Sequence, residues 1–338
     1  MLPTFFILGL IFIPLGIGLY LVSESVNEFT FDYTQCTQAG TALTQPPSSI
    51  SNIAQWAYDP QTAVCTIRFK LPKTFKAPVF LYYRLTNFYQ NHRRYVKSVS
   101  ASQLRGDALP ARQVESECSP LGTTGDLIYY PCGLIANSMF NDNIGLTNST
   151  ADFTLKRLTD AVAFTPYGFT SKGIAWPSDA VKYGATKYDL SKITPPKSWK
   201  VYNGQRLNPG VSWQANQASF NPSTDEHFQV WMRTAALPTF RKLYGKNLNA
   251  DMVEGQYEIA IAYNYDVTSY GGTKSIVIST SSWLGGKNPF LGIAYMIVGG
   301  VCILLGIIFL VKQMVSPRKL GDHTYLSWNQ GAPSSGER

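Results

Sequence analysis

Two long apolar runs bracket the chain, and the sequence between them is more polar. No charged residue occurs from position 2 to 22, and none occurs from 289 to 311. Both runs exceed the roughly 18 apolar residues that indicate a membrane helix, and a rise of about 1.5 Å per residue lets each cross a hydrocarbon core of about 30 Å. The sequence therefore predicts a first transmembrane helix over residues 1–22 and a second over residues 289–311.

A cleaved signal peptide is the alternative for the first run. Such a leader carries basic residues before its apolar stretch and a small-residue cleavage site after it. Only Met1 precedes this run, and the residues from Ser23 to Asn27 show no such site. A membrane anchor is the better interpretation, and the second run suggests nothing else.

Between the runs, several segments alternate apolar and polar residues, as half-buried strands do. Residues 64–71 alternate in this way, and residues 78–85 are rich in aromatics. Residues 256–263 and 273–279 resemble a late antiparallel pair joined through a Gly-Gly turn at 271–272. We expect a membrane protein of the α+β class, in which two transmembrane helices flank one large, mainly antiparallel-β domain over residues 23–288.

The middle of this domain shows little regular pattern. Between residues 133 and 222, Pro, Gly, Asn and Ser are frequent, so we expect long structured loops there. The helical candidates are short: residues 86–96, residues 134–141, and residues 225–244 with an interruption at Pro238.

Two spans place both chain ends on one side of the membrane, and the charge pattern selects that side. Lys312, Arg318 and Lys319 follow the second run, which predicts a cytoplasmic tail over residues 312–338. Both termini are then cytoplasmic, and residues 23–288 are lumenal or extracellular. This topology excludes a nucleic-acid-binding role.

Charged residues make up 15% of the chain, and the net charge is +8. A small basic cluster, His92, Arg93 and Arg94 with Lys97, falls in the outer domain. Such a cluster can bind anionic lipid head groups or an acidic loop of a partner. A solvated surface is the more common meaning.

The cysteines agree with an oxidising compartment. Cys302 lies inside the second apolar run, where it serves as a small packing residue. The other four, Cys36, Cys65, Cys118 and Cys132, fall in the outer domain, and four cysteines allow three pairings. Sequential pairing closes the shortest loops and is the one we favour; four free thiols are the alternative.

One N-glycosylation sequon, at Asn148, also lies on the predicted outer side. Asn221 does not count as a second one, because Pro222 blocks the acceptor.

Small residues mark both apolar runs. Gly292, Gly299 and Gly306 are seven residues apart, so they form one stripe along a helix face, the kind of face that packs closely against another membrane helix. Pro14 lies among glycines of the first run and predicts a kinked or locally unwound helix. The two spans could use these surfaces against each other. They offer more small-residue surface than one mutual contact consumes, which favours docking against a partner's membrane helices.

No motif for chemistry is present. The sequence has no Ser nucleophile elbow, no H-E-x-x-H, no phosphate-binding loop and no cysteine pair with zinc spacing. It also lacks an Asp-Lys-Thr-Gly phosphorylation motif, so the chain is not itself a P-type ATPase. Neither apolar run carries an ionisable residue, which disfavours a channel or transporter. We expect no catalytic site, no metal and no cofactor.

Several strings resemble the LEM-three/CDC-fifty family, the β-subunits of type IV P-type ATPases that flip phospholipids. They run from the first span to the second. They are LYYRLTNFYQNHRRY at 81–95, YPCGLIANS at 130–138, IAWPSD at 174–179, MRTAALPTFRKLY at 232–244, GTKSIVI at 272–278 and SWLGGKNPFLG at 282–292.

The resemblance implies a non-catalytic subunit that forms a heterodimer with a ten-span flippase, lets it leave the endoplasmic reticulum and supports its lipid transport there, in the Golgi and endosomes, and at the plasma membrane. It also implies an antiparallel β-core with N-glycans and sequentially paired disulfides. Family members usually carry a basic segment before the first span; a truncated N-terminus would account for its absence here. The alternative function is a free-standing surface receptor or adhesin that binds glycan or lipid.

Overall fold

The computed structural model describes residues 2–146, 152–160, 163–282 and 285–316. The chain divides into two compact units. One comprises Met1–Val26 with Ser282–Arg338, and the other comprises Asn27–Ser281.

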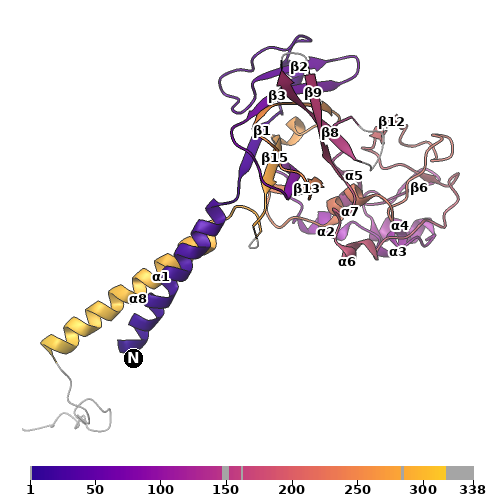
Figure 1. Ribbon diagram of the computed structural model, residues 1–338. Coiled ribbons are helices and arrows are strands. Elements are labelled where there is room, and N and C mark those ends of the chain that lie inside the picture. The colour runs from indigo at the N-terminus through magenta and orange to yellow at the C-terminus, as the bar shows by residue number, and fades with distance from the viewer. Residues whose placement is uncertain (1, 147–151, 161–162, 283–284, 317–338) are drawn as a thin grey trace, which may run out of the picture. The chain divides into compact units, whose positions relative to one another are not determined.

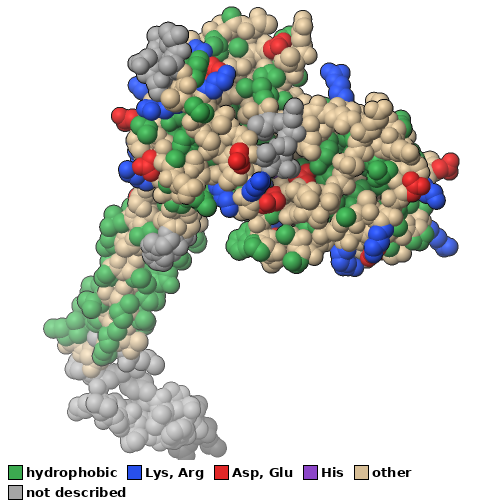
Figure 2. Space-filling model, turned by 45° about the vertical axis from the view of Figure 1, so that its right-hand side comes forward, with side chains coloured by type: hydrophobic (Ala, Val, Ile, Leu, Met, Phe, Trp, Pro, Cys, Tyr) green, Lys and Arg blue, Asp and Glu red, His purple; other side chains and the backbone are tan. Residues whose placement is uncertain are grey.

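The first unit is a pair of long helices, α1 (Leu2–Glu24) and α8 (Phe290–Val315). Both are long and apolar enough to cross a membrane. Figure 2 shows hydrophobic side chains along this pair. Pro14 lies inside α1, and the residues on both sides of it remain helical, so of the two expected effects local unwinding is wrong and a kink stays a prediction.

Two antiparallel sheets form the centre of the second unit. A four-stranded sheet has the order β1-β15-β4-β13, and a larger sheet has the order β2-β3-β14-β8-β9, with β7 also paired to β14. The bounds are β1 Glu28–Asp32, β2 Gln55–Asp59, β3 Val64–Leu71, β4 Val79–Leu85, β7 Asn143–Ile144, β8 Phe153–Asp160, β9 Ala163–Phe169, β13 Phe240–Asn247, β14 Gly255–Ala262 and β15 Lys274–Thr280.

Aromatic and branched side chains fill the space between the two sheets. Every second residue of β3 and β4 is buried, as the alternation in the sequence requires. Phe31 of β1 meets Phe69 of β3 with ring centroids 5.1 Å apart, and Phe69 stacks on Tyr257 of β14 at 5.8 Å. The contact between Phe31 and Phe69 joins the two layers, so the strand pattern of the sequence directly produces the core.

A second lobe, which we call the helical lobe, has its own core. Short helices and strands surround Trp213, Phe220 and Phe228, and Figure 1 shows them gathered away from β2, β3 and β9. Its elements are α2 (Arg93–Lys97), α3 (Ala101–Leu104), α4 (Ala111–Glu117), α5 (Leu134–Asn137), α6 (Pro177–Ala180), α7 (Glu226–Met232), β5 (Thr123–Thr124), β6 (Leu127–Tyr129), β10 (Ile193–Thr194), β11 (Val201–Tyr202) and β12 (Gln205–Arg206). Two 3-10 turns, η1 (Cys36–Gln38) and η2 (Thr268–Tyr270), complete the chain path that the structure describes.

A buried ion pair connects β15, the last strand, to the rest of the core. Lys274 Nζ lies 2.7 Å from Asp142 Oδ2, and neither side chain is exposed. Asp142 also accepts hydrogen bonds from the Tyr33 hydroxyl (2.9 Å) and from the backbone N–H groups of Asn264 (2.6 Å) and Tyr265 (2.7 Å). Burial lowers the pKa of Lys274 from its ordinary value, and the negative charge of Asp142 opposes that shift.

The expected pairing of the two late strands is wrong. β14 pairs with β3 and β8, whereas β15 pairs with β1 and β4 in the other sheet. The connection between them contains η2 and crosses from one layer to the other. Strands that are adjacent in sequence are adjacent in a sheet only about two-thirds of the time, and here the early strands take those places.

Three further expectations need correction. The helix expected over residues 86–96 begins only at Arg93, because Asn87 adopts a left-handed φ of 56° and its amide donates to Tyr270 O at 2.6 Å. The helix expected over residues 225–244 ends at Met232, and strand β13 begins at Phe240. The loop-rich middle contains the β8–β9 hairpin, which belongs to the larger sheet.

Candidate functional site

The glycines of the helix pair face each other. A Cβ added to Gly16 would lie 2.8 Å from Gly292 O, and one added to Gly9 would lie 3.0 Å from Gly299 O. Such distances are shorter than nearly all real Cβ contacts, so glycine at these positions lets the two backbones approach closely. We call Gly9, Gly16, Gly292, Gly299 and Gly306 the glycine seam.

The glycine stripe on the second span could pack against the first span or against a partner's membrane helices, and the structure shows the first arrangement. Gly292, Gly299 and Gly306 are buried, and each faces α1: an added Cβ would lie 2.7 Å from Tyr20 N at Gly292, 2.8 Å from Ile13 at Gly299 and 3.1 Å from Phe6 at Gly306. Within the described residues, these three glycines therefore pack the pair together and are not open to a partner. Gly9 and Gly16 are the matching positions on α1, also seven residues apart, and that spacing could have identified them from the sequence.

Other small residues of the pair face outward. An added Cβ at Gly18 or Gly300 meets nothing within 4 Å among the described residues, and Pro14 is exposed. Pro14 also deprives the carbonyl of Leu10 of its helical donor, because proline has no N–H. The outer surface of the pair thus retains places where another membrane helix can approach closely.

Polar contacts fix the register of the pair at one end. The hydroxyl of Ser23, just before the end of α1, accepts a hydrogen bond from the Asn288 N–H at 2.9 Å. Lys287 Nζ lies 3.2 Å from Glu24 Oε2. The two helices are therefore held together by polar contacts at this end and by close backbone packing along their length.

The basic cluster lies on α2 and the residue before it. The side chains of His92, Arg93, Arg94 and Lys97 are exposed, and none of them has an acidic side chain within 4 Å in the described part of the chain. The cluster is therefore a free cationic surface, which is what an acidic partner loop or anionic head groups would need.

The segment before the cluster is anchored to a second loop, which holds the cluster in place. Asn91 Nδ2 donates to Ala236 O at 2.9 Å, and Gln90 Oε1 accepts from the Ala235 N–H at 2.8 Å. Tyr89 and Leu237, one from each of these loops, are exposed. Cationic and apolar side chains therefore come from two segments that the fold joins.

The first disulfide, Cys36–Cys65, links η1 to β3 across a Cα–Cα distance of 6.2 Å. The second, Cys118–Cys132, spans 5.8 Å in the helical lobe. Sequential pairing is thus the arrangement in the structure. Asn148, Arg318 and Lys319 lie outside the described residues.

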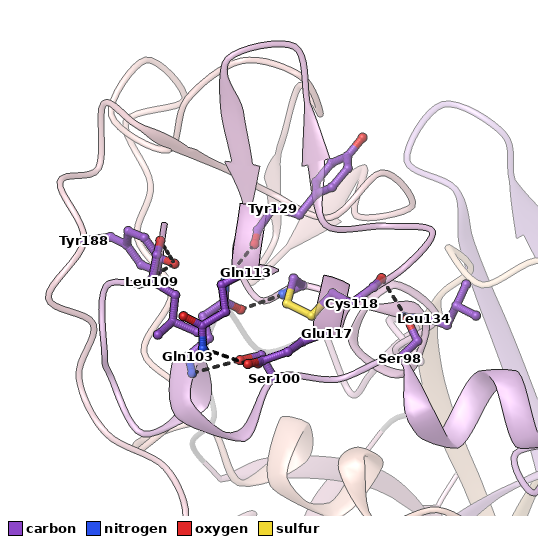
Figure 3. Close-up of a disulfide and its surroundings, with 11 residues drawn as sticks. Ser98, Ser100, Gln103, Leu109, Gln113, Glu117, Cys118, Tyr129, Leu134 and Tyr188 are labelled. Carbon is purple, nitrogen blue, oxygen red and sulfur yellow. Dashed lines mark hydrogen bonds between the residues drawn. A yellow bond between two sulfur atoms is a disulfide. The ribbon is translucent and has the colours of Figure 1, made fainter. Parts of the chain in front are cut away.

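The Cys118–Cys132 bond sits in a hydrogen-bond network that Figure 3 shows. The Ser98 hydroxyl donates to Cys118 O at 2.9 Å and accepts from the Leu134 N–H at 3.0 Å. Gln103 Oε1 accepts from the Cys132 N–H at 2.9 Å, and its amide nitrogen donates to Tyr129 O at 3.0 Å. The disulfide and these hydrogen bonds therefore hold in place the segment that precedes α5. The role of this disulfide is structural.

The buried titratable groups serve the fold. Lys242 donates to the carbonyls of Val230, Trp231 and Arg233, so it caps the C-terminal end of α7. Burial, with a smaller contribution from the Arg233 charge, lowers the pKa of Lys242 to about 8. Burial also lowers the pKa of His227, which lies against the Tyr244 ring. Among the described residues, no group of three or more His, Cys, Asp or Glu side chains could hold a metal ion.

Comparisons with known proteins extend these observations to the whole chain. The "Phospholipid-transporting ATPase accessory subunit CDC50" of Chaetomium thermophilum is 38% identical, over 98% of this chain and 86% of its own length. The "Phospholipid-transporting ATPase accessory subunit CRF1" of Saccharomyces cerevisiae is 39% identical, over 97% of this chain and 83% of its own. "Cell cycle control protein 50A" of Bos taurus is 42% identical, over 92% of this chain and 82% of its own.

A family comparison gives the same result. The model described as "LEM3 (ligand-effect modulator 3) family / CDC50 family" matches residues 19–319, which include the whole two-sheet domain and all of α8. With its two helices of membrane-spanning length and its β-rich domain, this membrane protein belongs to the LEM3/CDC50 family.

Proposed function

We propose that this chain is the non-catalytic accessory subunit of a phospholipid-transporting type IV P-type ATPase and forms a heterodimer with the catalytic chain. The observation that carries the proposal is the match over 97% or more of the chain to two fungal proteins that are named accessory subunits of such ATPases. The free cationic surface on α2 and the outward-facing small residues of the helix pair support it, since both suit a partner that lies partly in the membrane.

The proposal includes a topology. Residues 23–288 lie in the lumen or outside the cell, and both termini are cytoplasmic. Asn148 carries an N-glycan. In this arrangement the chain assists folding of the ATPase, its exit from the endoplasmic reticulum and its lipid transport in the Golgi, endosomes and plasma membrane.

The helix pair contributes the membrane part of the docking surface through its outer face. Pro14, Gly18 and Gly300 lie on that face. The glycine seam is not available for docking, because its glycines are buried between α1 and α8. The cluster of His92, Arg93 and Arg94 contributes the outer part by binding acidic groups of the partner or of lipid head groups.

Affinity purification of the full chain in a mild detergent, followed by mass spectrometry, tests the heterodimer. A ten-span P-type ATPase should co-purify, and deletion of this chain should retain that ATPase in the endoplasmic reticulum. Normal export of every such ATPase without this chain, together with no ATPase in the purified sample, would refute the proposal and favour a free-standing receptor.

Paired substitutions locate the docking face. Gly300→Leu adds a side chain on the outer face and should reduce co-purification while the chain itself stays folded. Val298→Leu is the matched control, since that position already carries an exposed large side chain. Gly299→Leu adds the same side chain inside the seam and should destabilise the helix pair itself. If Gly300→Leu leaves co-purification equal to that of Val298→Leu, the outer face does not dock at that position.

A further inference from the structure

Exposed large hydrophobic side chains gather on one face of the helical lobe. The compact unit Asn27–Ser281 exposes ten such side chains among its described residues, and half of them come from three neighbouring segments. These five are Tyr89, Val96, Trp176, Val181 and Leu237. Apolar side chains gathered in this way on a folded domain mark a site that contacts a protein or a membrane.

Contacts between the three segments join them into one surface. The guanidinium of Arg233, just after α7, lies 5.0 Å from the ring centre of Trp176, and its Nη1 lies 3.5 Å from Asp179 Oδ2 on α6. The chain continues from Arg233 to Leu237, and the hydrogen bonds described above hold that loop against the segment of Tyr89 and α2. Figure 1 shows α2, α6 and α7 gathered in the same part of the lobe. We call this surface the α2–α6 face.

The α2–α6 face is also strongly cationic. Its exposed lysines and arginines are Arg93, Arg94, Lys97, Arg105, Lys182 and Arg233. In the part of the chain that the structure describes, Asp179 is the only acidic side chain within 4 Å of any of these six. Six cations therefore share one carboxylate, and an anionic surface that approaches this face meets a positive potential.

A hollow of about 560 Å³ lies in this face, between α3, α6 and α7. Buried Leu104 and Ile135 form its apolar bottom, and the exposed side chains of Arg105, Lys182 and Arg233 line it as well. Its volume falls in the range of sites that hold a small molecule. Apolar surface below and cations beside it suit an anionic head group with the start of its acyl chains.

The exposed apolar side chains favour a lipid surface over an acidic peptide. Val181 and Leu237 keep 81% and 68% of their surface exposed, so they project from the lobe and do not line a groove. Projecting aliphatic side chains can enter the acyl boundary of a bilayer, while Trp and Tyr rings favour the level of the head groups and basic residues pair with anionic lipids. An acidic peptide would pair with the cations but would leave the projecting side chains in water.

The chain also keeps this domain near a bilayer. Three residues separate the end of α1 at Glu24 from the start of β1 at Glu28, and nine separate the end of β15 at Thr280 from the start of α8 at Phe290. Connections this short give the domain a high effective concentration at the membrane surface, so that even weak docking is populated. We propose that the α2–α6 face binds a bilayer surface that carries anionic phospholipid. This binding rests on the proposed function and its membrane topology, and it narrows the target of the basic cluster from acidic groups in general to lipid.

A fluorescent probe on the α2–α6 face of the full chain tests this. Cys302→Ser first removes the free cysteine, and Val181→Cys then carries the environment-sensitive dye NBD. The chain is placed in nanodiscs of phosphatidylcholine with or without phosphatidylserine, and doxyl-labelled phosphatidylcholine quenches the dye where it touches the bilayer. Quenching at position 181 should appear with phosphatidylserine and be lost without it. Val211→Cys is the matched control, an exposed valine outside this face, and should stay unquenched in both.

Variants separate the contributions of charged and apolar side chains. Arg93→Ala/Arg94→Ala should lower the ratio of docked to undocked forms about 25-fold, about fivefold for each basic side chain near an anionic surface. Lys192→Ala/Arg206→Ala removes the same charge from exposed positions outside this face and should leave the ratio unchanged. Leu237→Ser should also lower the ratio, because a polar side chain gains nothing from the acyl boundary.

Two results would overturn the proposal. The first is the absence of phosphatidylserine-dependent quenching at position 181. If Arg93→Ala/Arg94→Ala then also loses the co-purifying ATPase, the face binds an acidic loop of that partner and not lipid. The second is a docked fraction that Lys192→Ala/Arg206→Ala lowers as much as Arg93→Ala/Arg94→Ala does. Co-purification of an ATPase with the wild-type chain is measured separately in detergent, so a failure of the heterodimer and a failure of lipid docking are distinguishable.

Discussion

Removing the charge of Lys274 should strongly destabilise the compact unit Asn27–Ser281. In the Lys274→Met variant, the buried carboxylate of Asp142 keeps only neutral donors, the Tyr33 hydroxyl and the N–H groups of Asn264 and Tyr265. A buried charge that loses its partner costs about 3–5 kcal/mol. The unfolding free energy of the domain should fall by that amount.

The control is an ion pair of equal length on the surface. Lys76 Nζ lies 2.7 Å from Asp251 Oδ2, the same distance as in the buried pair, but 81% of the Lys76 side chain is exposed. Exposed pairs contribute about 0–1 kcal/mol. Lys76→Met should therefore change the unfolding free energy little, and the difference between the two variants isolates the effect of burial.

Thermal unfolding followed by tryptophan fluorescence measures both variants. In a domain of this size, 1 kcal/mol shifts the midpoint by about 2–4 °C, so Lys274→Met should lower it by roughly 6–20 °C. Asp142→Asn should cost a similar amount, because it leaves Lys274 unpaired.

The double variant decides whether the pair acts as a unit. In Lys274→Met/Asp142→Asn no charge remains buried, and the asparagine oxygen still accepts from the N–H groups of Asn264 and Tyr265. The double variant should therefore be more stable than the sum of the single losses predicts, by at least about 2 kcal/mol. Additivity within about 0.5 kcal/mol would refute the view that the two side chains interact directly.

Three other perturbations have definite expected results. Lys242→Met removes the donor to three carbonyls at the end of α7 and should cost about 1–3 kcal/mol by chemical denaturation. The pKa of Lys242 is lowered to about 8, whereas the pKa of an unfolded lysine is about 10.4. Between these pH values the unfolded state binds more protons, so the unfolding free energy of the wild type should rise with pH relative to that of the variant. Equal slopes of unfolding free energy against pH in the two proteins would contradict the assigned burial. Because burial lowers the pKa of His227, the unfolded state takes up a proton first as the pH drops, and the unfolding free energy should fall as the pH drops through about 6.5. His227→Phe should reduce the slope of unfolding free energy against pH in this range. An unchanged slope would exclude His227 as its source. Replacing Cys118 and Cys132 by serine opens a loop with a sequence separation of 14 and should cost about 3 kcal/mol in non-reducing denaturation, with no loss when the wild type is already reduced.

The sequence predicts those elements in which the spacing of apolar residues follows from burial of one side of the helix or strand. Residues 64–71 alternate because one side of β3 faces the core, and the predicted range coincides with the strand. The helix expected from residue 86 fails because Asn87 takes a left-handed conformation that its contact with Tyr270 stabilises. That contact comes from a residue 183 positions away, so no local pattern announces it.

Pairing of distant segments is the part that the sequence does not determine. Residues 256–263 and 273–279 look like neighbours in a hairpin, yet each pairs with strands from the first third of the chain. The same limit applies to the membrane helices. The spacing of Gly292, Gly299 and Gly306 shows that they share a face, but only the position of α1 shows what that face meets.

The place of β15 between β1 and β4 imposes a delay on folding during synthesis. Asn27 and Thr280, which hydrogen-bond at the start of this sheet, are 253 positions apart. At a synthesis rate of about 5–20 residues per second, β1 waits roughly 13–50 s before the strand that joins it to β4 exists. During that interval, the edges of both strands and much of the apolar surface between the sheets are unprotected. A nascent chain of this kind therefore exposes aggregation-prone surface for most of its synthesis.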